Sequence, residues 1–176
     1  MADLTPLLAF RWSPRSFDPT AALTEDEATS LLEAARWAPS AGNAQPWRFA
    51  LGHREDGTWK RILVGLPSGD QRWARHAAAL LLGAHTGGDP ERAAYDLGQA
   101  VAHLTVQATA LGLHVHQLTR FDRAGVATEL DLAVGVRPMV VVAVGQLGDP
   151  FALPEDLLGR EAELRRRRPL ADLLLA

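Results

Sequence analysis

Cysteine is absent from this chain of 176 residues, and its absence excludes several kinds of site at once. Without thiols the chain has no disulfide, thiolate zinc site, iron–sulfur cluster or cysteine nucleophile. Long hydrophobic runs are absent too: Met139 to Val144 is as long as any, against roughly 20 residues for a membrane helix. The N-terminal Met-Ala-Asp-Leu-Thr-Pro has neither a basic start nor an apolar stretch, so we predict no signal peptide. We therefore expect a soluble, cytoplasmic protein.

Several nucleotide-binding and hydrolase motifs are also missing. The sequence has no G-x-G-x-x-G and no Walker loop, so a Rossmann or P-loop site has no support. It has no G-x-S-x-G, and Ser40 has no evident base close to it in sequence, which disfavours a serine hydrolase. Charged residues make up 22% of the chain and the formal net charge is −3, which favours neither nucleic acid nor an anionic membrane as a partner.

Two helices are clear from apolar spacing and end signals. Thr24 and Glu27 have the spacing of a capping box. The helix face that follows, ended by Pro39, consists of Ala28, Leu31, Leu32 and Ala35. A longer helix, about Glu91 to Leu111, closes at Gly112 and carries the stripe Leu97, Val101, Leu104, Ala108 and Leu111. The other faces of this second helix carry small alanine side chains, which allow close packing. We therefore expect the helix to be packed on most sides and to lie centrally.

The predicted strands complete an α+β fold. Trp47 to Leu51 and Arg61 to Gly65 are predicted to form a hairpin around Glu55-Asp56-Gly57. Ala77 to Leu82 reads as a buried strand or a short helix, which periodicity alone does not decide. Two further strands are predicted at His114 to Leu118 and Met139 to Val144. The length suits a single domain, residues 1–176.

Histidines and arginines are the candidate site residues. His114 and His116 alternate along a predicted strand and share a face, but no carboxylate lies at a matching spacing, so we favour ordinary, partly buried histidines and predict no metal site. The segments "RWSPRSF" (residues 11–17) and "RRRRPL" (165–170) combine arginine forks with hydroxyls or a proline. Such groups suit a phosphate. The alternatives are a solvated charged surface or, for the second segment, an interaction tail.

Taken in order, these segments resemble the FMN-dependent nitroreductase family over nearly the whole chain. The most specific match is to A-P-S-x-x-N-x-Q-P-W, which spans Ala38 to Trp47. The family's R-x-S-x-R opening and R-x-R-x-P-L close also match, and so do motifs of its central helix, the strand end after it and the last apolar strand. The matching residues are Arg11, Ser13, Arg15, Asp96, Gly98, Ala100, Gly112, Leu113, Arg120, Phe121, Asp122, Gly145, Arg165, Arg167, Pro169 and Leu170.

The resemblance implies a fold, a cofactor and a partner. The fold is a mixed, mainly antiparallel central sheet flanked by helices, in an intertwined homodimer with two shared sites. The cofactor is FMN, which NAD(P)H reduces in a ping-pong reaction before a nitroaromatic, quinone or similar acceptor is reduced. Because the flavin N5 carries the hydride, no side chain is assigned as catalytic.

The resemblance also assigns residues to the flavin. Its phosphate and ribityl end is held by Arg11, Ser13, Arg15, Arg165 and Arg167. Its ring is held from the partner subunit by Pro39, Ser40, Ala41 and Asn43, and small residues such as Ala41 let the backbone approach closely. Thr119 and Arg120 take the positions whose backbone faces the N5 side.

Three features depart from the family pattern. The Asn and Lys that many members place near the flavin pyrimidine have no clear match, and the candidates are Asp70 or Gln71 for the Asn and Arg72 or Arg75 for the Lys. His114 and His116 replace small or uncharged residues, and Arg120 replaces a glycine. The alternatives are therefore a specialised flavin enzyme (dehalogenase-like, flavin-fragmenting or deazaflavin-using) and a flavin-binding protein with a degenerate catalytic site. A nucleic-acid module built on the arginine run is the weakest alternative.

Overall fold

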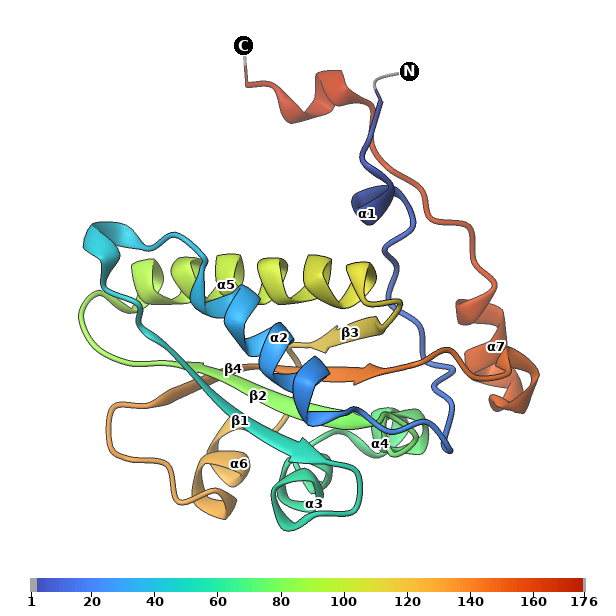
Figure 1. Cartoon of the computed structure of the whole chain (residues 1–176), viewed down its shortest axis with the longest axis horizontal. Helices are drawn as coiled ribbons and strands as arrows, with labels where there is room; N and C mark the ends of the chain where they lie inside the picture. The colour runs from blue at the N-terminus through green and yellow to red at the C-terminus, as the bar shows by residue number, and fades with distance from the viewer. Residues whose placement is uncertain (1–2, 176) are drawn as a thin grey trace.

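The computed structural model describes residues 3–175 and contains one four-stranded antiparallel sheet (Figure 1). The strand order is β1 (Trp47–His53), β2 (Ala79–His85), β4 (Arg137–Gly145) and β3 (His114–Leu118). The two inner strands are almost wholly buried, in keeping with their runs of apolar residues. The α+β fold is thus confirmed, and every described strand pair is antiparallel.

Helices cover both faces of the sheet and give two apolar cores. On one face α2 (Glu25–Arg36) and α5 (Pro90–Ala110) pack over Val142 and Val144. On the other lie α3 (Gly57–Val64), α4 (Ser68–Ala74) and α6 (Arg123–Glu129), as Figure 1 shows. This second core contains the fully buried Trp73, Ile62 and Val126. Each sheet face therefore buries alternate residues of the same strands.

The predicted helix ends and most predicted strands are confirmed. Thr24 accepts the amide of Glu27 while the Glu27 carboxylate accepts the amide of Thr24, a complete capping box. The long helix α5 differs from its prediction by one residue at each end. Gly112 follows it with φ +75°, the left-handed conformation that ends a helix. The ambiguous segment around Ala77 to Leu82 forms strand β2.

The predicted strand at Arg61 to Gly65 is wrong, because this segment lies in helix α3. The Asp56 carboxylate accepts the amide of Trp59 at 2.7 Å, which makes Asp56 a helix N-cap rather than part of a hairpin turn. Trp59 and Ile62 lie three positions apart, on the same side of the helix, and both are buried. Helical spacing over eight residues therefore prevails over the Asp-Gly turn signal.

The expected central position of α5 is also wrong within one chain. Its buried residues lie on the side that faces the sheet and α2, including Leu97, Leu104 and Ala108. Ala102, Ala110 and Leu111 are exposed instead. Helix α5 thus covers one face of the sheet, and much of its outer side is exposed.

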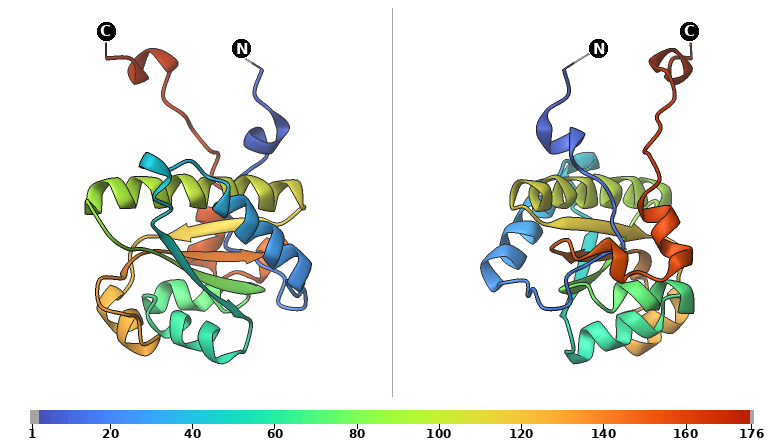
Figure 2. Two further views of the ribbon diagram at one scale, coloured as in Figure 1. Left: turned by 60° about the vertical axis from the view of Figure 1, so that its left-hand side comes forward. Right: turned by 90° about the vertical axis from the view of Figure 1, so that its right-hand side faces the viewer.

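The terminal segments extend away from the body on the same side of the molecule (Figure 2). The N-terminal segment contains α1 (Pro6–Ala9), and the C-terminal one follows α7 (Glu155–Glu161) and contains a short 3-10 turn, Leu170–Leu173. None of the helices among residues 3–175 is long and apolar enough to cross a membrane.

Candidate functional site

The two arginine-rich segments meet, although 154 positions of sequence separate Arg11 from Arg165. The Arg165 guanidinium donates to the carbonyls of Arg11 and Ala9. The Arg11 guanidinium donates to the Ser13 hydroxyl at 3.3 Å. The fold therefore brings the two predicted phosphate-binding segments together.

The charge of this site is not neutralised. Burial first, and then the nearby charges of Arg165 and Arg167, lower the pKa of Arg11. Among residues 3–175, none of these three guanidinium groups forms an ion pair with a carboxylate. Like charges held together without a counter-ion favour an anionic ligand, and arginine forks match phosphate oxygens.

His114 and His116 border this site through aromatic neighbours. The His116 ring lies 4.6 Å from that of Trp73, and its Nδ1 is 2.9 Å from the carbonyl oxygen of Pro14. Burial is the main cause that lowers the pKa of His116, so the neutral ring that donates from Nδ1 is favoured. His114 packs edge-on against Trp12 at 6.3 Å, and its buried Nδ1 has no hydrogen-bond partner among the described residues. No cluster of three potential metal ligands occurs in residues 3–175.

The four candidates of the α4 region differ in what they contact. Gln71 donates its amide to the carbonyl of Leu66 at 2.7 Å, and Asp70 accepts the Trp73 indole N–H at 3.2 Å. Arg72 forms an ion pair of 2.8 Å with Asp156 on α7. Arg75 is exposed and forms no side-chain hydrogen bond or ion pair among residues 3–175. Three of the four are thus held by local contacts.

The loop predicted to hold the flavin ring lies at the opposite end of α5 from the arginines (Figure 1). Its Ala41 amide donates to Asp96, a buried residue in the N-terminal half of α5, at 3.2 Å. The Ser40 hydroxyl accepts the Gln45 amide at 3.0 Å, and Asn43 has φ +58°. Helix α5 has 21 residues and is therefore about 30 Å long. One chain does not bring this loop to the arginine site.

Thr119 and Arg120 follow the edge strand β3 and are both exposed. Arg120 makes no side-chain hydrogen bond among the described residues, whereas Phe121 lies half-buried with the Arg123 guanidinium 6.0 Å from its ring. Asp122 accepts the amide of Gly125 and begins α6. The backbone at this strand end is thus open on its outer edge, with helix α6 fixed directly after it.

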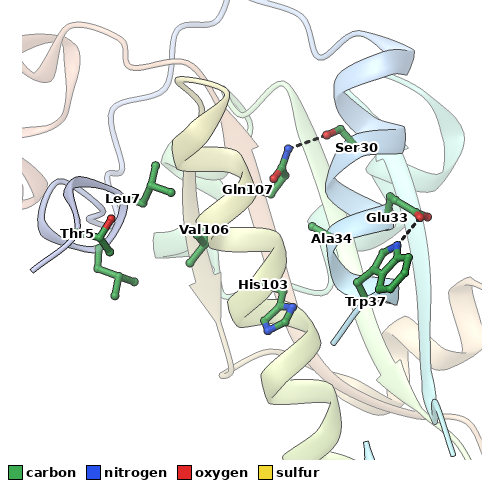
Figure 3. A pocket seen from close by; sticks show the side chains of 10 residues that line it. Thr5, Leu7, Ser30, Glu33, Ala34, Trp37, His103, Val106 and Gln107 are labelled. Atoms are coloured by element: carbon green, nitrogen blue, oxygen red, sulfur yellow. Dashed lines mark hydrogen bonds between the residues drawn. The ribbon is translucent and has the colours of Figure 1, made fainter. Parts of the chain in front are cut away.

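An open groove of about 640 Å³ lies between α1 and the outer sides of α2 and α5 (Figure 3). Trp37 forms one wall, although it is 71% exposed, and its indole donates to Glu33 at 2.7 Å. Bonds from Arg36 and Trp37 lower the pKa of Glu33 to about 2. Leu7, Ala34 and Val106 supply apolar surface. The groove is an uncovered face of the α2–α5 layer.

Sequence reasoning missed two residues that organise the site. Glu161 accepts the amides of Arg15 and Ser16, from 146 and 145 positions away. Trp73 is fully buried in the second core, and the His116 ring packs against its indole. The sequence gives each residue only a weak signal, its position. Glu161 lies four positions before Arg165, and Trp73 lies among Asp70, Gln71, Arg72 and Arg75, the candidates for the missing Asn and Lys.

Comparisons relate the chain to known proteins. The profile of the nitroreductase family matches residues 8–63. A solved structure described as an oxidoreductase containing FMN is 34% identical, and the match covers 99% of this chain and 91% of that one with a TM-score of 0.90. The uncharacterized 15.4 kDa protein in the ask 5′ region of Mycolicibacterium smegmatis is 38% identical over 112 residues, which are 61% of this chain and 76% of that protein. The oxygen-insensitive NAD(P)H nitroreductase of Salmonella typhimurium is 34% identical over 55 residues, 31% of this chain and 25% of that enzyme.

The likeness of the fold extends over nearly the whole chain and agrees with the motifs. The profile match contains the first arginine segment and the loop around Asn43, and the structural match adds the C-terminal segment with Arg165. The chain belongs to the nitroreductase family.

Proposed function

We propose that the protein is an FMN-dependent oxidoreductase that uses NAD(P)H and reduces nitroaromatic, quinone or similar acceptors. The observation that carries this proposal is the group of three guanidinium side chains, from both ends of the chain, that no carboxylate neutralises among residues 3–175. A phosphate group would relieve their mutual repulsion. The similar solved structure that is described as containing FMN supports flavin as the source of that phosphate.

The residues of the chain bind and orient the flavin in this proposal. Arg11, Ser13, Arg15 and Arg167 hold the phosphate and ribityl end, and Arg165 joins the two segments that carry them. Thr119 and Arg120 present the backbone at the end of β3 to the reactive edge of the ring. When bound, FMN accepts a hydride at N5 from NAD(P)H and passes two electrons to the acceptor. The protein supplies orientation and positive charge, and no side chain need be a nucleophile.

A homodimer completes the site in this proposal. The loop with Pro39, Ser40, Ala41 and Asn43 lies too far from its own arginines, so it would hold the ring at the site of a second copy. Two-fold symmetry then creates two identical sites. The uncovered groove beside Trp37 and the exposed leucines of the C-terminal segment supply apolar surface for this contact.

The α4 region favours one candidate for the pyrimidine end. Of the two basic candidates, Arg72 is paired with Asp156, whereas Arg75 forms no side-chain hydrogen bond or ion pair among residues 3–175, so we assign Arg75 the role of the missing Lys. Gln71 would have to break its bond to the Leu66 carbonyl to reach the ring, and Asp70 would have to break its bond to the Trp73 indole. These bonds are the observation that favours the second candidate function, a flavin-binding protein with slow turnover.

An absorption spectrum followed by anaerobic titration with NADH and NADPH tests both candidates. The enzyme is expected to be yellow with non-covalently bound FMN, and either nicotinamide should bleach it rapidly. Bound FMN that both nicotinamides reduce only slowly would favour the second candidate. A colourless protein that takes up no added FMN contradicts both.

A further inference from the structure

The two ends of the chain dock on one another through main-chain groups. Glu161, the last residue of α7, accepts the Arg15 amide at 2.9 and 3.0 Å and the Ser16 amide at 3.0 Å. The Ser16 hydroxyl donates to the same carboxylate at 2.6 Å. Four residues further on, Arg165 donates to two carbonyls of the N-terminal segment, one of them that of Arg11. The segments therefore run antiparallel, with Glu161 opposite Arg15 and Arg165 opposite Arg11.

Glu161 is a buried carboxylate with no cationic partner among residues 3–175. It is 9% exposed, so it has lost most of its contact with water. Such burial is unfavourable unless hydrogen bonds replace the lost solvent, and bonds from N–H or O–H groups to a charged oxygen are among the stronger ones. Arg15 and Ser16 have no other acceptor for their amides within the described chain. Glu161 thus determines the course of the backbone that carries Ser13 and Arg15.

The contacts divide the arginines into two groups. Arg165 already uses its guanidinium on two main-chain carbonyls. Arg11 bonds only to the Ser13 hydroxyl, and Arg167 only to the neighbouring carbonyl of Arg166. A guanidinium has five N–H donors, so Arg11 and Arg167 keep most of theirs for a ligand. The docking of the segments, and not charge alone, brings these donors together.

We propose that Glu161 is a positioning residue for phosphate recognition: it fixes the Arg11–Ser16 segment against the C-terminal arginines and does not itself contact the ligand. This inference rests on the proposed function, because the phosphate belongs to FMN. It predicts the direction in which FMN affinity changes when the Glu161 charge is removed. A negative charge in the docked segments that carry the arginines opposes the binding of an anion there, so removal of that charge alone should tighten FMN binding. If Glu161 acts by positioning, its removal weakens binding instead.

Full-length protein freed of flavin tests the proposal, with FMN and riboflavin as probes and quenching of flavin fluorescence as the readout. Riboflavin lacks the phosphate and reports on the rest of the site. Glu161→Gln keeps the size of the side chain, and its carbonyl can still accept at the Oε1 place, but its NH2 group then faces the Arg15 amide at the Oε2 place, and the negative charge that strengthens all four bonds is lost. We expect it to raise the Kd for FMN about tenfold or more and the Kd for riboflavin less than about twofold. Glu163→Gln is the matched control, because it removes the same charge from an exposed position in the same segment, and it should not weaken FMN binding.

Each other result has a defined meaning. An FMN Kd at or below the wild-type value overturns the inference, and so does an equal loss for both flavins, which would give Glu161 a general structural role. If Glu161→Gln does not fold by circular dichroism, Ser16→Ala removes only the 2.6 Å bond and allows the same comparison. A selective loss of FMN affinity in Ser16→Ala supports the inference, and no selective loss overturns it. A wild-type protein that binds neither flavin refutes the proposed function itself.

Discussion

The arginines of this chain share one chemistry but differ in their surroundings, and these differences determine which of them we propose as phosphate ligands. Arg165 is held by main-chain carbonyls, Arg72 by the carboxylate of Asp156, and Arg167 by no side chain among residues 3–175. A charge that is already satisfied contributes less to a new ligand than one that is free. Residue type alone therefore does not identify the ligand-binding arginines.

We predict that Arg15→Ala and Arg167→Ala each weaken FMN binding. Loss of a charge-assisted contact costs about 1.5–3 kcal/mol, or roughly ten- to a hundredfold in affinity. Fluorescence titration of the flavin-free variants measures the change. Arg168→Ala is the control, since Arg168 is exposed and makes no side-chain hydrogen bond in the described chain. Wild-type affinity in either variant would mean that the arginine in question is only a surface charge.

Arg120→Gly is predicted to lower the reduction potential of the bound flavin and to admit bulkier acceptors. An arginine that reaches over the ring edge stabilises the reduced flavin and narrows the space for the acceptor. Its partly screened charge should contribute about 1 kcal/mol, or about 20 mV for a two-electron couple. Redox titration and a series of acceptors of increasing size measure both effects. Because Arg120 is exposed, it could turn to solvent instead, and an unchanged potential and acceptor range would show this.

At the scale of elements, short sequence patterns correctly predicted those features that depend on interactions between neighbouring residues. The capping box of α2 and the ends of α5 depend on residues within a few positions of one another, and both predictions are confirmed to within one residue. The Asp-Gly turn failed because the same dipeptide also begins a helix when apolar residues follow at helical spacing. Our prediction treated Asp56-Gly57 only as a turn and did not consider that Asp56 could be the N-cap of a helix.

Helix α3 provides a stability test of this correction. Asp56 accepts the amides of Trp59 and His53, so Asp56→Ala should lower the free energy of unfolding by about 1 kcal/mol, within the usual range for a lost N-cap. Urea denaturation measures the change. Arg61→Ala, on the exposed side of the same helix, should stay within about 0.5 kcal/mol of wild type. Equal values for the two variants would argue against the cap.

The site was predictable only in part, for the same physical reason. The family resemblance supplied Arg11, Ser13 and Arg165, and the fold brings these three residues together. The roles of Glu161 and Trp73 depend on contacts across the whole chain, and neither residue belongs to a recognisable motif. Tertiary packing likewise determines which arginines already have partners, and the spacing of residues in the sequence does not reveal this.

At the scale of the whole molecule, the buried His85 and three half-buried histidines should make stability depend on pH. Burial is the largest cause that lowers the pKa of His76, His85, His114 and His116. The unfolded chain therefore binds protons at a higher pH than the folded one, so stability is complete above about pH 6.5 and is lost as the pH falls through the folded-state values. Glu33, with a pKa of about 2, titrates below this window.

The measurement is the urea midpoint at about pH 7.5 and about pH 5.5, which we expect to be lower at the acidic value. His116→Gln should reduce the difference, because Gln can still donate to Pro14 but does not titrate. A midpoint that does not change between the two pH values would contradict burial of neutral histidines.

The last prediction concerns assembly. The C-terminal segment is rich in leucine but packs on little of its own chain: Leu170, Leu173 and Leu174 are 72%, 65% and 71% exposed. Monomeric proteins rarely expose such a patch, and full burial of a leucine contributes about 1.5–3 kcal/mol. The double variant Leu173→Asp, Leu174→Asp should therefore weaken a homodimer that light scattering detects in the wild type at micromolar concentration.

The double variant should also lose FMN affinity, because the loop around Asn43 would no longer reach the site of a second copy. Val134→Asp is the control: Val134 is fully exposed on the loop before β4, outside the terminal segments, and should change neither mass nor affinity. A wild-type monomer would refute the shared site. A wild-type dimer that the double variant leaves intact would instead assign the contact to the α2–α5 groove and make the C-terminal leucines dispensable for assembly.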